Sequence, residues 1–168
     1  AGYGTDGFQT GGQIFEKNFL GKGIELITDI QLSTDSIKCQ FIYSKPNFAY
    51  TDNDLSTSLK STSNDFLTLY GYKSKETGVS VGTKFEQYEK LFFSPELSFS
   101  IEDLTTNVNA SDILKKQEGN YSDLYFNYGL NYNLTDSNFN PKKGYVINFN
   151  QELPLYSDTN ELSNTLTY

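Results

Sequence analysis

The sequence lacks several residue types on which most catalytic and nucleic-acid-binding sites depend. Its 168 residues contain no arginine, histidine, tryptophan or methionine, and a single cysteine, Cys39. Without histidine the commonest general base and metal ligand is missing, and one cysteine can form neither an internal disulfide nor a thiolate zinc site. Without arginine, and with a net charge of −8, no nucleic-acid partner is expected. We therefore expect neither an enzyme nor a cofactor or metal site.

Long apolar runs are also absent, although aromatic residues are abundant. No window reaches 18 consecutive apolar residues, so a transmembrane helix is not expected. Phenylalanine and tyrosine nevertheless make up 15% of the chain, while the mean hydropathy is −0.52. This combination indicates apolar and polar residues that alternate at close spacing.

Alternation with a period of two predicts an all-β chain. The clearest predicted strand covers residues 124–134, where Leu124, Phe126 and Tyr128 share one face and Asn127 lies on the other. A helix over these residues would place polar groups inside its apolar stripe. The same period predicts strands at residues 24–32, 37–44, 91–101 and 145–153, and less regular ones at 8–17, 55–73, 78–86 and from 162.

The connections between these strands are predicted from turn-forming residues. Leu67 and Leu69 are out of phase with Phe66 in the predicted strand 55–73, which leaves the register of this strand ambiguous near Asn64. A β-bulge would reconcile the two phases, and a connection is expected at 74–77. The other connections are expected at residues 5–7, 18–23, 34–36, 46–53, 87–90, 102–120, 135–144 and 154–161.

The longest of these connections, 102–120, carries a helix signal. Ser111 can cap a short helix and Gly119 can end it. We interpret the lysine pairs, 115–116 in this connection and 142–143 in a later one, as solvated loop charge.

Two environments suit such strands: a soluble β-domain with its apolar face inside, or a membrane barrel with that face in lipid. The clear strands are about ten residues long, close to the length that crosses a bilayer at a tilt. Their apolar faces end in tyrosine, as at Tyr43 and Tyr132, which is typical of interfacial girdles. Their other faces carry Asn, Gln, Glu and Lys, which suit a wet lumen. The pattern favours an antiparallel transmembrane β-barrel.

Two apparent catalytic motifs lack the context that their chemistry requires. The GYGTDG segment at 2–7 matches a dinucleotide fingerprint, but a strand rather than a helix is predicted to follow it. The GVSVG segment at 78–82 matches a nucleophile elbow, but the chain has no histidine to activate Ser80. Cys39 lies on the apolar face of its predicted strand and is interpreted as a small hydrophobic residue.

Several short segments keep a fixed order along the chain. They are GYGT at 2–5, GFQTG at 7–11, NFLGKG at 18–23, SKPNF at 44–48, FNYGL at 126–130, and Asp136 followed by NPKKGY at 140–145. Together they resemble the barrel of the BamA family, the outer-membrane protein assembly factors that belong with the bacterial surface antigens.

The resemblance implies a barrel of about 16 strands, of which residues 1–168 would form a partial transmembrane domain of about ten strands. By the same resemblance, this domain would lack both the POTRA domains and the C-terminal strands. The implied activity is folding and inserting other proteins into the outer membrane of a Gram-negative bacterium, without bond chemistry. The implied partners are the lipid bilayer, unfolded outer-membrane protein clients and accessory assembly lipoproteins. In the weakly paired first strand, Ala1, Gly2, Tyr3, Gly4 and Thr5 would pair with an incoming client strand.

Other interpretations stay open at this point. Gly2 and Gly4 also fit ordinary strand-end and turn positions. A small closed outer-membrane barrel of about eight to ten strands could act as a pore or structural protein. A soluble secreted β-domain that binds a ligand is disfavoured by the strand length and by the lack of cysteine pairs.

Overall fold

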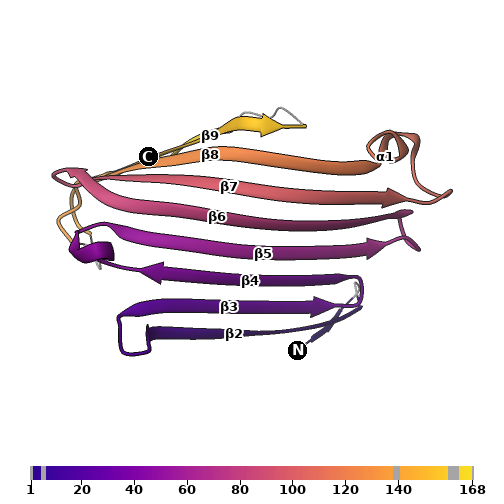
Figure 1. The fold of residues 1–168 in the computed structure, drawn as a ribbon, viewed down its shortest axis with the longest axis horizontal. Helices are drawn as coiled ribbons and strands as arrows, with labels where there is room; N and C mark the ends of the chain where they lie inside the picture. Colours follow the sequence, from indigo (N-terminus) through magenta and orange to yellow (C-terminus); the bar gives the residue numbers. More distant parts are fainter. Residues whose placement is uncertain (1, 5–6, 138–140, 159–162, 168) are drawn as a thin grey trace.

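The computed structural model describes residues 2–4, 7–137, 141–158 and 163–167. They form an antiparallel meander in which ten strands lie side by side in sequence order (Figure 1). The strands are β1 (Gly2–Gly4), β2 (Gly7–Phe19), β3 (Ile24–Ser33), β4 (Ser36–Lys45), β5 (Asp54–Phe66), β6 (Tyr72–Tyr88), β7 (Leu91–Thr106), β8 (Gly119–Asn133), β9 (Val146–Ser157) and β10 (Ser163–Thr167). The all-β, antiparallel fold class predicted from the alternation is confirmed.

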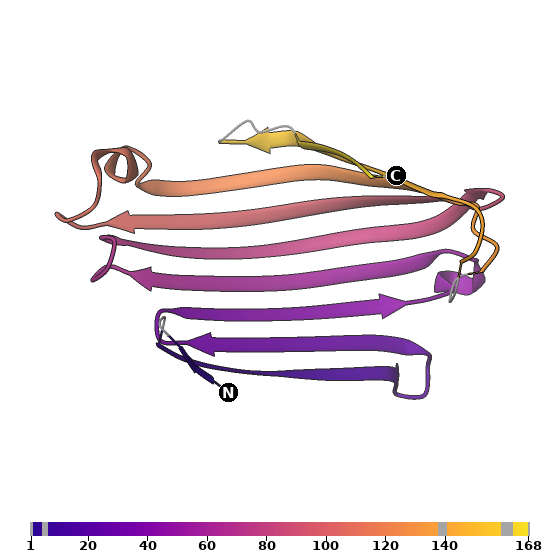
Figure 2. The ribbon, with the colours of Figure 1, turned by 180° about the vertical axis from the view of Figure 1, so that it is seen from behind.

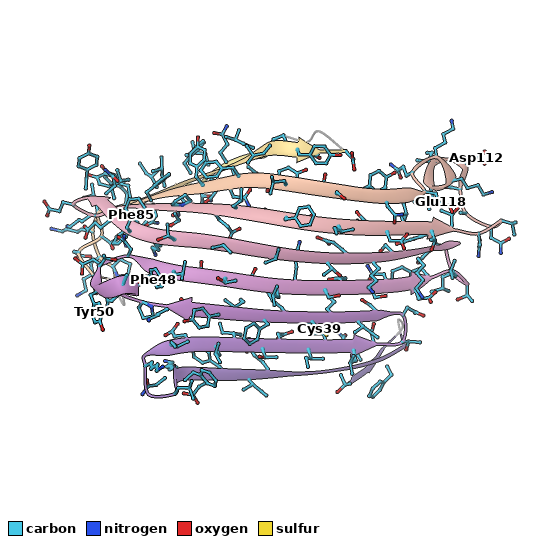
Figure 3. The ribbon with its side chains drawn as sticks, viewed as in Figure 1. Cys39, Phe48, Tyr50, Phe85, Asp112 and Glu118 are labelled. Atoms are coloured by element: carbon cyan, nitrogen blue, oxygen red, sulfur yellow. The ribbon has the colours of Figure 1, made fainter. Side chains whose placement is uncertain are left out.

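Successive connections alternate between the two ends of the sheet, as Figures 1 and 2 show from opposite sides. We call one end the helix end, because the β7–β8 connection there contains α1 (Asp112–Lys116). The other is the turn end, where the β4–β5 connection contains the short 3-10 helix η1 (Phe48–Tyr50). Figure 3 shows Asp112 and Glu118 at the helix end and Phe48, Tyr50 and Phe85 toward the turn end.

The β5–β6 connection differs from the prediction. Residues 67–71 form the turn, residues 74–77 lie inside β6, and Asn64 continues the regular register opposite Ser74. The register ambiguity near Asn64 is resolved without a bulge, because Leu67 and Leu69 belong to the turn and not to a strand face. The turn closes with the Gly71 N–H donating to the Phe66 carbonyl oxygen over 2.9 Å.

Contacts between neighbouring loops fix the position of this turn. Asn107 N–H donates to the Gly71 carbonyl oxygen and Asn107 Nδ2 to the Leu67 carbonyl oxygen, each at 2.8 Å. Gly71 has a φ of +79°, and a Cβ there would lie 2.7 Å from the Cα of Ala110, which is buried. The turn therefore depends on a loop that lies about 40 residues away in the sequence.

The helix predicted in the long connection is present. Ser111 Oγ accepts a hydrogen bond from the Leu114 N–H (3.3 Å), as an N-cap does. The helix ends at Lys116 with Gln117 as its C-cap, whereas Gly119, predicted to end it, begins β8. The loop is shorter than predicted because β7 continues to Thr106. Among the described residues, no helix is both long and apolar enough to cross a membrane.

The sheet has two chemically different faces and almost no core. Among the described residues, only Ile24 and Ala110 are buried hydrophobic residues. Large apolar side chains such as Leu97, Phe99 and Ile101 stay 39–47% exposed on one face. A face of this kind needs a cover, and the described strands supply no second layer over it.

The meander is open. β1 and β10 are the two edges of the described sheet and do not pair with each other. The ten described strands thus do not close into the small barrel that the sequence left possible.

Candidate functional site

The polar face is built by the register of the strands. One row of paired residues crosses the sheet from β3 to β9 with a polar residue or glycine at every position: Glu25, Ser44, Ser56, Gly82, Glu96, Asn127 and Glu152. Because side chains alternate between faces, these residues all project from the same side of the sheet.

Side chains on this face form a hydrogen-bonded chain across four strands. The hydroxyls of Ser58 and Ser80 lie 2.8 Å apart, and Ser80 Oγ donates to Glu96 Oε2 over 3.1 Å. Asn127 Nδ2 donates to Glu96 Oε1 (3.3 Å) and to Ser98 Oγ (3.1 Å). The network holds Glu96 between β6 and β8, and it depends on the pairing of these strands, which a period of two does not specify.

Glycines in β6 make room for these longer side chains. A Cβ on Gly82 would lie 3.1 Å from Glu96 Cβ, and one on Gly78 would lie 2.8 Å from Lys60 Cε. Lys60 in turn forms an ion pair with Glu76 (2.6 Å). The result is a groove of about 600 Å³ along the polar face.

This face also carries much of the negative charge of the chain. By register its carboxylates are Glu25, Asp29, Asp54, Glu76, Glu86, Glu96, Glu102, Asp123 and Glu152, and its lysines are Lys38, Lys60 and Lys84. Exposed charges of this density need water, so this face is the wet one.

The opposite, apolar face ends at the turn end in a cluster of aromatic rings. Ring centroids of Phe85 and Phe93 are 5.7 Å apart, those of Phe93 and Tyr128 6.1 Å, and those of Tyr128 and Phe149 6.0 Å. Cys39 lies on this face, exposed and between Ile30 and Ser61 in its row, as a small hydrophobic residue would. Aromatic girdles of this kind mark the membrane–water boundary of barrels.

The apolar face forms a band that runs obliquely across the strands. On β4 the band ends at Tyr43, and the residue paired with Tyr43 through the intervening strands is Phe126 of β8. On β8, however, the band continues six residues beyond Phe126, to Tyr132. At the helix end the row of Ile37 leads to Asn120, while the band starts four residues later, at Leu124. With rises of about 3.3 Å per residue and about 4.8 Å between strands, these shifts give a tilt of about 35–45°. That is the tilt of strands in membrane barrels.

Of the five residues predicted to pair with an incoming client strand, three form the edge strand β1. Gly2, Tyr3 and Gly4 form β1 opposite Gln9, Phe8 and Gly7 of β2, whereas Ala1 and Thr5 lie outside the described residues. The start of β2 is fixed by Thr34, whose Oγ1 accepts from the Phe8 N–H and whose N–H donates to the Phe8 carbonyl oxygen, both at 3.1 Å. The edge strand β1 therefore pairs with a strand, β2, whose start is held in place by the β3–β4 turn.

Comparison with known proteins gives the family. A sequence model of the Omp85 superfamily domain matches residues 18–168. The chain belongs to the Omp85 superfamily. Among solved structures, BamA from Haemophilus ducreyi lacking POTRA domains 1–3 matches with a TM-score of 0.68 and 24% sequence identity, over 91% of this chain. The Omp85 chain spans 32% of the length of that structure and shares its barrel fold. No curated protein sequence matches.

The β8–β9 turn of this Omp85 chain shows why the Asp136 motif has its spacing. Asp136 Oδ1 accepts hydrogen bonds from the N–H groups of Lys142 (2.9 Å) and Lys143 (3.2 Å), and these bonds hold the pKa of Asp136 below its ordinary value. Gly144, at φ +105°, lies where a Cβ would overlap Thr135 Cα and the Leu134 carbonyl. The aspartate and the glycine together close the turn.

The two enzyme-like motifs lie in the wrong places for their chemistry. Residues 78–82 lie inside β6, whereas a nucleophile elbow needs a strand-to-helix turn. Residues 2–4 and 7 belong to β1 and β2, so no helix follows the glycines to bind a phosphate.

Proposed function

We propose that this chain is part of the barrel wall of an outer-membrane assembly factor, which folds and inserts other β-barrel proteins in a Gram-negative bacterium. Membership of the Omp85 superfamily is the observation that supports this most. The described sheet is open, and the chain matches 32% of the length of the BamA structure. Both observations support a barrel of about 16 strands, to which residues 1–168 contribute about ten. The clients would be unfolded outer-membrane proteins, helped by accessory lipoproteins.

The proposed mechanism is strand templating at a seam beside β1. An edge strand offers its N–H and C=O groups to an incoming strand, so main-chain pairing supplies the binding energy. Gly2 and Gly4 in β1, with Gly7, Gly11 and Gly12 in β2, leave this edge with little side-chain packing. Separating β1 from its neighbour across the seam therefore costs little free energy, so an incoming client strand can take the place of that neighbour.

Proline substitutions in the full-length protein test this proposal. Tyr3→Pro should abolish client insertion while the barrel keeps its heat-modifiable migration, because the affected pairing lies at the seam. The matched change Thr165→Pro falls in β10, at the opposite edge of the described sheet. It should lower client insertion only to the extent that it lowers the amount of folded barrel. If client insertion per folded barrel falls equally in the Tyr3→Pro and Thr165→Pro proteins, β1 has no special role.

A further inference from the structure

A second groove lies on the apolar face at the turn end. Its volume is about 620 Å³, and its lining is Tyr88, Glu89, Leu91, Leu130, Tyr132, Ile147 and Phe149. Two register rows make its floor, one through Leu91 and Tyr132 and the next through Leu130 and Phe149. A register shift between Glu86 and Tyr88 marks the end of the β6–β7 ladder beside the groove, and Tyr88 stands 70% exposed at its rim.

Three lysines lie in the two turns that connect the strands of this groove, and we call them the rim lysines: Lys90 between β6 and β7, and Lys142 and Lys143 between β8 and β9. The β6–β7 turn, with Lys90, is joined to the end of β8 by the bond from the Asn133 N–H to the Lys90 carbonyl oxygen (3.1 Å). On the other side of β8, Tyr145 directly follows the turn that contains Lys142 and Lys143, and its ring lies 6.4 Å from that of Tyr132 in the groove. The groove therefore lies between two lysine-bearing turns.

The carboxylates beside these lysines are occupied by backbone groups. Glu86 Oε1 accepts from the Lys90 N–H (2.6 Å), and Asp136 Oδ1 accepts from the N–H groups of Lys142 and Lys143. In the described part of the chain, the ion pairs are formed by Lys60 and Lys73, so the ammonium groups of the three rim lysines form none. Glu89 is the carboxylate that lines the groove itself.

We propose that this rim binds an anionic phospholipid of the membrane, with an acyl chain in the groove and the phosphate at Lys90, Lys142 and Lys143. The lining suits hydrocarbon, and Tyr88, Tyr132 and Tyr145 stand at the level where headgroups begin. A peptide strand does not suit the groove, because the floor residues of β7, β8 and β9 already lie in sheet ladders on both sides of β8. This proposal requires that the apolar band faces lipid, but it does not require that the protein folds or inserts clients.

Lipid retention by the full-length protein tests this proposal. The purified protein in detergent is titrated with phosphatidylglycerol or phosphatidylcholine and examined by native mass spectrometry. Wild type should retain phosphatidylglycerol preferentially, and added salt should weaken that preference. The double change K142Q/K143Q should reduce phosphatidylglycerol retention on the order of tenfold, since each juxtamembrane lysine contributes to attraction of anionic lipid. Glu89→Gln should act in the opposite direction and increase it.

Matched controls separate this site from general effects of charge and volume. K115Q/K116Q removes the same charge from α1 at the helix end and should leave retention unchanged. Ile147→Trp should fill the groove and lower retention, whereas Ile101→Trp, on the same face near the helix end, should not. Equal retention of the two lipids by wild type, equal effects of the two lysine pairs, or displacement of the lipid by inorganic phosphate alone would each overturn the proposal.

Discussion

The assignment of the two faces can be tested by placing the same charge on each side of one strand. Leu97 lies on the apolar face of β7, near the middle of the band, and is 46% exposed to the surroundings. Ser100 lies on the polar face of the same strand, between Gly78 and Asp123 in its row. Leu97→Lys and Ser100→Lys therefore each introduce one ammonium group on the same strand, about 10 Å apart along it, one toward lipid and one toward the wet groove.

The expected difference follows from the two environments. A lysine that faces lipid near the bilayer midplane destabilises a barrel by about 2–4 kcal/mol, which is roughly 30- to 700-fold in the folding equilibrium. The Ser100→Lys ammonium lies beside Asp123 in the acidic groove, so its cost should be below about 1 kcal/mol. Leu97→Asn controls for the lost leucine without adding charge.

Equilibrium folding of the full-length protein into phospholipid vesicles, followed in urea by heat-modifiable migration on gels, measures both costs. A larger destabilisation by Ser100→Lys than by Leu97→Lys would refute the assignment of faces. Similar costs for both would show that neither face lies in lipid.

Two further predictions concern the connections. Because hydrogen bonds lower the pKa of Asp136, its stabilisation of the turn is present above its ordinary value of 3.8 and is lost as the pH falls through the lowered value. Wild type and Asp136→Asn should therefore differ in amide exchange protection at Lys142 and Lys143 above pH 3.8 and converge in stronger acid. Gly71→Ala should cost about 1–3 kcal/mol and expose the helix end to proteases, because a Cβ there meets the β7–β8 loop. Gly21→Ala, at φ +69° in open space, should cost less, and equal losses at the two glycines would contradict the packing argument.

The sequence was sufficient to predict the strands and their faces. Side chains alternate strictly along β7 and β8, so Leu97 and Asn127 could be assigned to opposite faces without coordinates. The short helix after Ser111 could be predicted for the same reason, because capping is a local interaction. Local patterns thus gave the fold class.

Features that depend on distant contacts could not be predicted. The β5–β6 turn lies at 67–71 and not at the predicted 74–77, because Asn107 and Ala110, from another connection, fix Gly71 in position. The bond between Ser80 and Glu96 depends on the exact pairing of β6 with β7, which alternation leaves undetermined. Lys142 and Lys143 are exposed, as their interpretation as solvated charge implies; their place at the end of the β8–β9 ladder depends on strand pairing, which the sequence alone does not give.

Three register shifts occur among the strand residues that the structure describes, and each lies where the band ends. Those after Glu16 in β2 and after Glu86 in β6 are at the turn end, and the one beside Leu124 in β8 is at the helix-end limit of the band. A one-residue insertion in the middle of β7 would turn every later side chain of that strand to the other face and place charges in lipid. The same insertion beyond the band would alter only residues already in water. Length variation among relatives of this wall should therefore be confined to the strand ends, and the span between them should keep its length.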